Sequence, residues 1–217
     1  MIKIRPFGQV NKHPVYEVIL TNANGMYVSS CTLGCIITAI ATPDANGIIE
    51  NVVCSFDTAE KYKQYPQFFG AAIGPFAGRL EDAILEINEV PFRARANEGL
   101  HLLHGGNDGF HNQQWQFETG VSSRGQFVKY LLNFESIDFP GKLYMSITYT
   151  LTASNELIIS YEGISDADTI LNCTNHSYFN LSGNLKRTIE GHTLKFASRG
   201  MLYIDKQGLP LGNIENV

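Results

Sequence analysis

Residues that could carry out acid–base chemistry gather in the segment Asn172–Leu181, which reads Asn-Cys-Thr-Asn-His-Ser-Tyr-Phe-Asn-Leu. In this segment His176 is the side chain that can gain or lose a proton near neutral pH. The asparagine, serine and tyrosine side chains around it can donate or accept hydrogen bonds. Polar groups beside flat aromatic faces suit a polyhydroxylated ring such as a sugar. The same residues also fit a strand end whose polar side chains satisfy one another and whose histidine is structural, and the residue types alone do not decide.

A single cation, Arg79, ends the otherwise uncharged and glycine-rich run 68–79. Small residues allow a backbone or a ligand to approach closely. The guanidinium could bind hydroxyls or a carboxylate at the floor of a pocket. The more common fate of such an arginine is to extend into solvent or to form a structural ion pair.

Three further histidines lie in the middle of the chain. His104 precedes two glycines that leave open space around it, so we expect it to face a site. His101 lies three positions earlier, on the opposite face of a strand, and is expected to be a surface or packing residue rather than a second ligand of one metal. His111 follows a phenylalanine in a loop and is expected to be solvated, whereas Trp115 is expected in the core or in a pocket wall.

Composition narrows the function classes. The chain has 217 residues, 44% of them hydrophobic, and a net charge of −5 with no block of like charges. Such a charge pattern gives no footprint for nucleic acid or an anionic membrane. The start Met1–Pro6 lacks the apolar run of a secretory signal, and no uncharged apolar run reaches transmembrane length. The four cysteines match no zinc spacing, so we expect buried free thiols, no metal and a cytoplasmic protein.

Most of the chain has the pattern of short strands separated by tight turns. One helix is expected at 58–65, and Gly34 is a candidate bulge. The first half suggests an antiparallel meander, and the clear strands after residue 127 suggest successive antiparallel neighbours in an all-β sandwich or barrel. The expected strands are 15–20, 26–30, 32–42, 48–54, a hairpin over 83–92 that turns at 88–89, 127–137, 142–153, 156–164, 169–174, 193–196 and 201–204.

Three motifs in this order resemble a known family. They are Ala77-Gly78-Arg79, Leu103-His104-Gly105-Gly106 and Asn175-His176-Ser177-Tyr178-Phe179-Asn180-Leu181, with Trp115 and Pro140-Gly141 between the two histidine motifs. Together they resemble the aldose 1-epimerases, also called galactose mutarotases, from about Pro14 to Gly212. The resemblance implies a large antiparallel β-sandwich, the galactose mutarotase-like supersandwich, formed by a single domain over residues 1–217.

The resemblance also implies an activity and roles for residues. The family interconverts the α and β anomers of free hexoses such as galactose and glucose, with no metal or organic cofactor. By resemblance, His176 is the general acid and His104 belongs to the same catalytic site. Arg79 and His104 bind and orient the sugar, with His176 also in contact with it. Phe179 or Trp115 could stack on the apolar face of the ring.

The family's general base is a glutamate near its C-terminus, and a sugar-binding aspartate lies in an Asp-Phe-Arg-type motif. Neither occurs in this sequence, so the resemblance predicts a chain that lacks the C-terminal portion of the sandwich, with exposed sheet edges that favour self-association. The carboxylates left to replace the base include Glu98, Asp108, Glu135 and Asp138.

Two alternative functions stay open. One is a carbohydrate-binding module that keeps the three site residues without catalysis. The other is a relative that acts on hexose phosphates, for which Arg79 alone is thin support because phosphate sites gather several cations or helix N-terminal amides.

Overall fold

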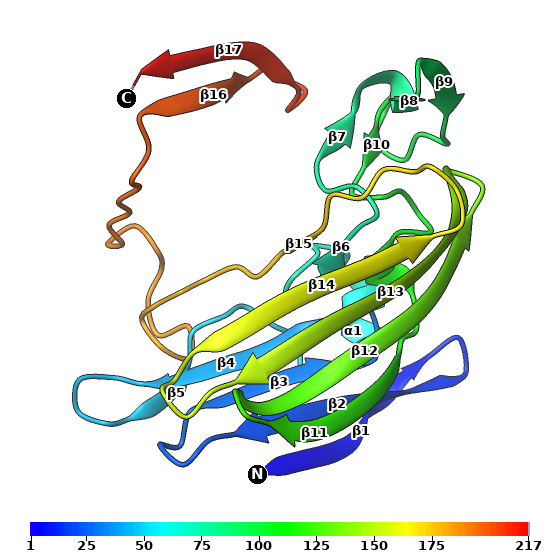
Figure 1. Cartoon of the computed structure of the whole chain (residues 1–217). Helices are drawn as coiled ribbons and strands as arrows, with labels where there is room; N and C mark the ends of the chain where they lie inside the picture. The colour runs from blue at the N-terminus through cyan, green and yellow to red at the C-terminus, as the bar shows by residue number, and fades with distance from the viewer. Residues whose placement is uncertain (217) are drawn as a thin grey trace.

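The computed structural model describes residues 1–216 and contains two antiparallel sheets packed face to face (Figure 1). The first sheet has the order β1-β2-β3-β4-β5 and the second has the order β11-β12-β13-β14. The first sheet comprises β1 (Ile2–Val10), β2 (His13–Thr21), β3 (Tyr27–Cys31), β4 (Ile37–Pro43) and β5 (Ile49–Asn51). The second comprises β11 (Gln116–Ser122), β12 (Gly125–Ser136), β13 (Phe139–Leu151) and β14 (Leu157–Ser165). The all-β sandwich expected from the sequence is confirmed.

The first sheet is the predicted meander, with three differences. The strand expected over 48–54 is shorter, because β5 ends at Asn51. β1 was not predicted, because most of its side chains are exposed and its sequence shows little apolar alternation. The strand expected over 32–42 is wrong in its first part: residues 33–35 form a turn that contains Gly34, and β4 begins only at Ile37. Buried apolar side chains occur on both sides of that turn, so composition alone did not reveal it.

Three of the four strands of the second sheet follow the predicted runs closely, whereas β11 was not predicted. β12, β13 and β14 lie within a few residues of the expected bounds and pair in succession, with Tyr130 opposite Ile147 and Ile147 opposite Tyr161. β13 starts at Phe139, inside the segment expected to be a turn. β14 ends the sheet, so one of its edges is unpaired within the described residues.

The core fills the space between the two sheets. Val18 and Leu20 of β2 belong to the same cluster as Ile147 and Tyr149 of β13, and all four are at most 1% exposed. Burying each such side chain contributes about 1.5–3 kcal/mol. The Tyr149 hydroxyl donates a hydrogen bond of 2.7 Å to the carbonyl oxygen of Cys35, so its burial leaves no polar group unpaired.

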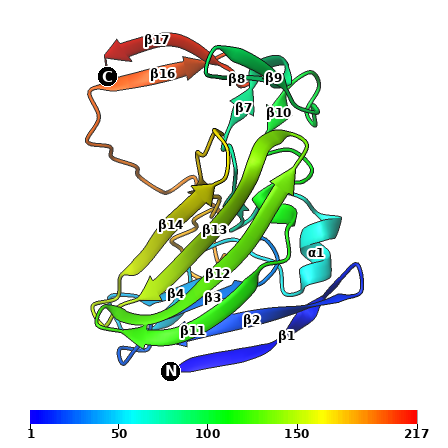
Figure 2. The same cartoon turned by 45° about the vertical axis from the view of Figure 1, so that its right-hand side comes forward.

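The chain between the two sheets carries short elements, of which those over residues 79–103 lie at one end of the molecule (Figure 2). The helix α1 packs beside β1, and the predicted helix and the predicted 83–92 hairpin are both confirmed. These elements are α1 (Ala59–Gln64), β6 (Ala72–Ile73), β7 (Arg79–Leu80), the 3₁₀ turn η1 (Glu81–Ala83), β8 (Ile84–Ile87), β9 (Val90–Arg93), β10 (Leu102–Leu103) and the 3₁₀ turn η2 (Phe110–Asn112).

The C-terminal part of the chain contains fewer strands than its composition suggests. The strand expected over 169–174 is wrong, because the structure has only β15 (Thr174–Asn175), which pairs with β6. The segment 193–196 is not a strand either, since no neighbouring strand pairs with it. The chain then forms the hairpin of β16 (Gly200–Ile204) and β17 (Pro210–Asn216), whose turn lies near β7 and β10. β16 was predicted and β17 was not.

All four cysteines are free, with Cys31 and Cys35 buried and Cys54 and Cys173 partly buried. Within residues 1–216, no helix is both long enough and apolar enough to cross a membrane.

Candidate functional site

His176 is held by the short pairing of β15 with β6. Its backbone N–H donates to the carbonyl oxygen of Ala71 at 2.9 Å, and its carbonyl oxygen accepts from the N–H of Gly70 at 3.1 Å. The Asn175 side chain donates to Gly70 at 2.9 Å, and its oxygen accepts from the hydroxyl of Ser177 at 2.7 Å. The side chains of Asn175 and Ser177 therefore hold the backbone on either side of His176. The imidazole of His176 takes no part in these hydrogen bonds.

His104 follows β10 and has a left-handed backbone, with φ of 54°. Its Nδ1 accepts a hydrogen bond of 3.1 Å from the backbone N–H of Gly78. In the neutral ring the proton must therefore sit on Nε2, which is a donor. The next residue, Gly105, has φ of +79°, and a Cβ there would lie 2.1 Å from a carbonyl oxygen of Gly74. Only glycine fits at that position, so the glycine of the motif sets where His104 can lie.

The two predicted histidines lie together. The ring centroids of His104 and His176 are 5.0 Å apart, with the ring planes at 81°. The pKa of His104 is lowered to about 4, mainly by burial. The electrostatic influence of His176 and Arg79 adds to this lowering, and Glu98 opposes it. His104 is therefore neutral at pH 7, and with its Nδ1 occupied it presents a single donor.

Arg79 lies on β7, directly opposite Leu103 of β10. His104 is the next residue after Leu103, so the pairing of these strands places Arg79 near it. Its Nε and Nη2 donate to the two carboxylate oxygens of Glu98 at 2.5 and 2.9 Å. These hydrogen bonds and the negative charges of Glu98 and Asp205 raise the pKa of the guanidinium. Arg79 thus forms an ion pair, which is one of the two common fates of such an arginine, and it also lies beside His104.

Phe68 is a residue of this region that the sequence did not single out. Its ring centroid lies 5.0 Å from that of His104, 4.9 Å from His111 and 5.7 Å from His176. Its φ is 60°, an unusual value for a bulky side chain. The adjacent aromatic pair before Gly70 was a visible signal, but its contact with three imidazoles depends on tertiary structure.

The prediction for His111 is wrong. The ring is largely buried against Phe68, and its Nδ1 is buried without a hydrogen-bond partner among the described residues. Burial is the main reason that its pKa falls to about 4, and the electrostatic influence of Lys63, His104 and His176 acts in the same direction. His111 lines a cavity of about 150 Å³ beside Phe68. A loop position suggested solvation, but this loop is covered by the segment that carries Phe68.

Of the two aromatic residues suggested for stacking, Trp115 lies in the core, as the alternative expectation for it has it, and Phe179 lies elsewhere. Trp115 is 2% exposed, and its Nε1 donates to the carbonyl oxygen of Phe110, so it is a core residue and not a stacking surface. Phe179 is 55% exposed and lines a different, apolar hollow. Tyr178 is the aromatic residue of the motif that lies beside His176, with ring centroids 5.1 Å apart. His101 is buried, as expected for a packing residue.

The four carboxylates considered as replacements for a general base all form ion pairs. Neither His104 nor His176 has a carboxylate hydrogen-bond partner within residues 1–216. The pairs are Glu98–Arg79, Asp108–Arg95, Asp138–Arg95 and Glu135–Lys142.

Comparison with known proteins places this arrangement in a family. The profile of the family described as Aldose 1-epimerase matches residues 16–217. The chain is 32% identical to an aldose 1-epimerase of Haemophilus influenzae over 222 residues, covering 100% of this chain and 63% of that protein. It is 33% identical to a galactose mutarotase of Bos taurus over 201 residues, covering 93% of this chain and 58% of that protein.

A solved structure has the same fold. The crystal structure of galactose 1-epimerase from Lactobacillus acidophilus NCFM superimposes with a TM-score of 0.87 at 26% identity, covering 100% of this chain and 63% of that one. The chain thus spans about three fifths of the length of the relatives it matches. Both the profile match and the shared fold lead to the conclusion that the chain belongs to the aldose 1-epimerase family.

Proposed function

We propose that this protein takes part in the interconversion of the α and β anomers of free aldohexoses, with galactose and glucose as the substrates. In this proposal His176 is the general acid. His104 and Arg79 hold the sugar, and His104 donates from Nε2. The sugar lies over the two imidazole edges, beside Tyr178.

The chemistry requires the sugar ring to open and close. A base removes the proton from the C1 hydroxyl while His176 protonates the ring oxygen, and the C1–O5 bond breaks to give the open aldehyde. Rotation about C1–C2 and reclosure, with the proton transfers reversed, give the other anomer. A positioned acid contributes about 10²–10⁴-fold to such a step. Holding the hydroxyl groups still adds a contribution from proximity.

The observation that carries the proposal is the close approach of His104 and His176, with ring centroids 5.0 Å apart, beside Arg79. These residues come from three motifs far apart in the sequence. The protonation of His104 also suits sugar binding. The Gly78 N–H occupies Nδ1, so the neutral ring carries its proton on Nε2 and can donate it to a sugar oxygen. A phosphorylated sugar fits less well, since Glu98 already neutralises the guanidinium of Arg79.

Polarimetry on freshly dissolved α-galactose tests the proposal. The approach to anomeric equilibrium should accelerate in proportion to protein concentration, and His176→Ala should reduce that acceleration by about 10²–10⁴-fold. His13→Ala is a matched control, because His13 is an exposed histidine at the start of β2. Equal rates for the His176→Ala variant and the unmodified chain would contradict the role of His176.

A second function, sugar binding without catalysis, is favoured by one observation: the four candidate carboxylates are committed to ion pairs. It predicts that galactose raises the thermal midpoint of the chain while the rate of mutarotation stays at that of buffer. The absence of both sugar binding and mutarotation would refute both functions.

A further inference from the structure

The turn between β16 and β17 has a fixed shape. The Asp205 carboxylate accepts hydrogen bonds from the backbone N–H groups of Gln207 and Leu209 at 2.8 and 2.9 Å. The N–H of Gly208 also donates to the carbonyl oxygen of Asp205, at 3.0 Å. An aspartate that bonds its own turn in this way restricts the backbone. The turn, residues 205–209, is therefore an ordered unit that can act as one body.

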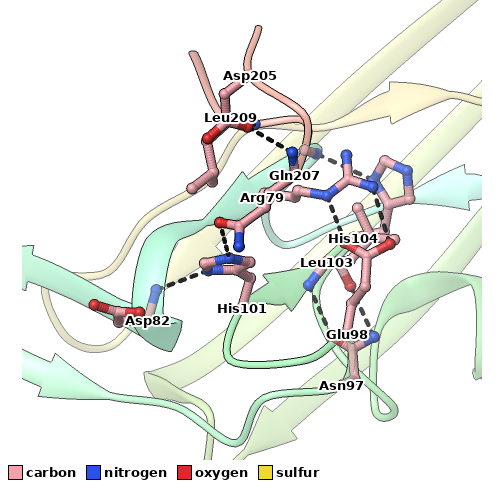
Figure 3. A network of polar contacts seen from close by, with 11 residues as sticks. Arg79, Asp82, Asn97, Glu98, His101, Leu103, His104, Asp205, Gln207 and Leu209 are labelled. Carbon is pink, nitrogen blue, oxygen red and sulfur yellow. Dashed lines mark hydrogen bonds and ion pairs between the residues drawn. The ribbon is translucent and has the colours of Figure 1, made fainter. Parts of the chain in front are cut away.

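This turn is attached to the segment that carries the site (Figure 3). The Nδ1 of His101 accepts from the backbone N–H of Asp82 at 3.1 Å, so its Nε2 carries the proton when the ring is neutral. That Nε2 lies 3.2 Å from the side-chain oxygen of Gln207. His101 thus links the turn to η1 and β10 through defined donor and acceptor atoms.

The same turn lies directly against the guanidinium of Arg79. A Cβ built on Gly208 would lie 2.6 Å from Nη1 and 2.9 Å from Cζ of Arg79, distances that real contacts do not reach. Gly208 has φ of +79°, so glycine also suits its backbone. Glu98 accepts hydrogen bonds from Nε and Nη2 of the same guanidinium. The arginine is therefore confined between a carboxylate and a backbone surface that has no side chain.

We propose that Glu98 and Gly208 are positioning residues for Arg79, and that the 205–209 turn is the element that sets how this arginine meets the sugar. Glu98 engages two of the five N–H donors of the guanidinium, and three remain for a ligand. The plane of these three donors is fixed before a sugar arrives. The part of the proposal that concerns sugar affinity rests on the proposed function, whereas the positioning itself does not.

Fixing a long side chain in advance removes an ordering cost that binding would otherwise carry. For one rotamer-rich side chain this cost corresponds to about 3- to 10-fold in affinity. Loss of the confinement should therefore weaken sugar binding by that factor without abolishing it, because the two histidines still face the ligand.

The test compares Gly208→Ala with Gly212→Ala. Both glycines lie in the same hairpin, with φ of +79° and +76°, so an alanine strains the backbone equally at either position. At Gly212 nothing lies within 4 Å of the added Cβ, whereas at Gly208 the methyl group displaces the guanidinium. Two readouts are needed: the dissociation constant for galactose, and the Nε–H resonance of Arg79 in nitrogen-15 NMR.

In the unmodified chain the Arg79 Nε–H should be protected from exchange with water by its bond to Glu98. Gly208→Ala and Glu98→Gln should each remove that protection and raise the galactose dissociation constant by about 3- to 10-fold. Gly212→Ala should do neither. An Nε–H signal that is unchanged in Gly208→Ala would overturn the positioning role. A protected signal in a chain that binds no galactose would instead refute the proposed function and leave the positioning intact.

Discussion

Acidification should destabilise this protein through His111. The ring is largely buried beside Phe68, its Nδ1 has no partner among the described residues, and Lys63, His104 and His176 surround it with positive or protonatable groups. Burial and these charges lower the pKa of His111 in the folded chain from 6.5 to about 4. The unfolded chain therefore takes up a proton as the pH falls below 6.5, while the folded chain resists it down to about pH 4.

This difference in pKa gives the sign and size of the effect on the free energy of unfolding. The stability that the neutral His111 contributes is complete above pH 6.5, is lost as the pH falls toward 4, and does not change further at lower pH. At about 1.36 kcal/mol for each pH unit between the two pKa values, His111 alone costs roughly 3 kcal/mol of stability. His104 acts in the same direction, but its ring is only half-buried and its share is smaller because solvent screens it.

Urea unfolding at pH 7 and at pH 4 measures the effect. The unmodified chain should lose roughly 3 kcal/mol more between these two pH values than His111→Leu does, since the variant has no ring to protonate. His13→Leu is the control, because His13 is exposed, and its loss should equal that of the unmodified chain. If the His111→Leu variant and the unmodified chain lose the same stability, the ring is not kept neutral by its surroundings and the reasoning is refuted.

Three further outcomes are expected. Gly105→Ala should destabilise the chain by more than 2 kcal/mol in urea unfolding, because its Cβ meets a backbone carbonyl 2.1 Å away, whereas Gly99→Ala, with φ of +59° and open space, should cost only about 1 kcal/mol. Arg95→Leu should cost about 3 kcal/mol, since the 1%-exposed Asp138 carboxylate loses its charged partner and keeps only the backbone N–H of residue 95. Loss of the exposed partner in Lys142→Leu should cost less than about 1 kcal/mol. The unpaired edge of β14 predicts a sedimentation coefficient that rises with concentration, and a constant value would contradict self-association at that edge.

Sequence patterns predicted those parts of the fold that depend on local alternation and on turns. β12, β13 and β14 alternate apolar and polar residues, and the 83–92 hairpin turns at its two polar residues, so both were found. The segment 169–174 has comparable β-branched composition, but only Asn172, in an isolated bridge to Phe76, and Thr174, at the start of β15, pair with another segment. A strand exists only where a partner supplies hydrogen bonds along its length. β1 was missed for the opposite reason, because pairing with β2 makes it a strand although its side chains are mostly exposed.

The candidate site shows the same limit at the level of single residues. The motifs identified His104 and His176, and the structure brings the two rings together. The burial of His111 and the contact of Phe68 with three imidazoles were not visible, because both depend on the segment 66–70 lying against residues 104–111. Nothing in the local sequence of a loop records which distant segment covers it.

The polar residues around the two histidines form hydrogen bonds that position the backbone and one ring nitrogen. The Asn175 amide donates to the backbone of Gly70 and its oxygen accepts from Ser177, so the Asn175 side chain is engaged within the protein. The Gly78 N–H likewise occupies one nitrogen of His104 and leaves the other. Hydrogen bonds that satisfy the backbone therefore decide which ring nitrogens remain free. It follows that Asn175→Ala should displace His176, because the variant loses the hydrogen bonds to Gly70 and Ser177. The resulting loss of mutarotation rate in polarimetry should equal that of a variant at a residue that binds the sugar.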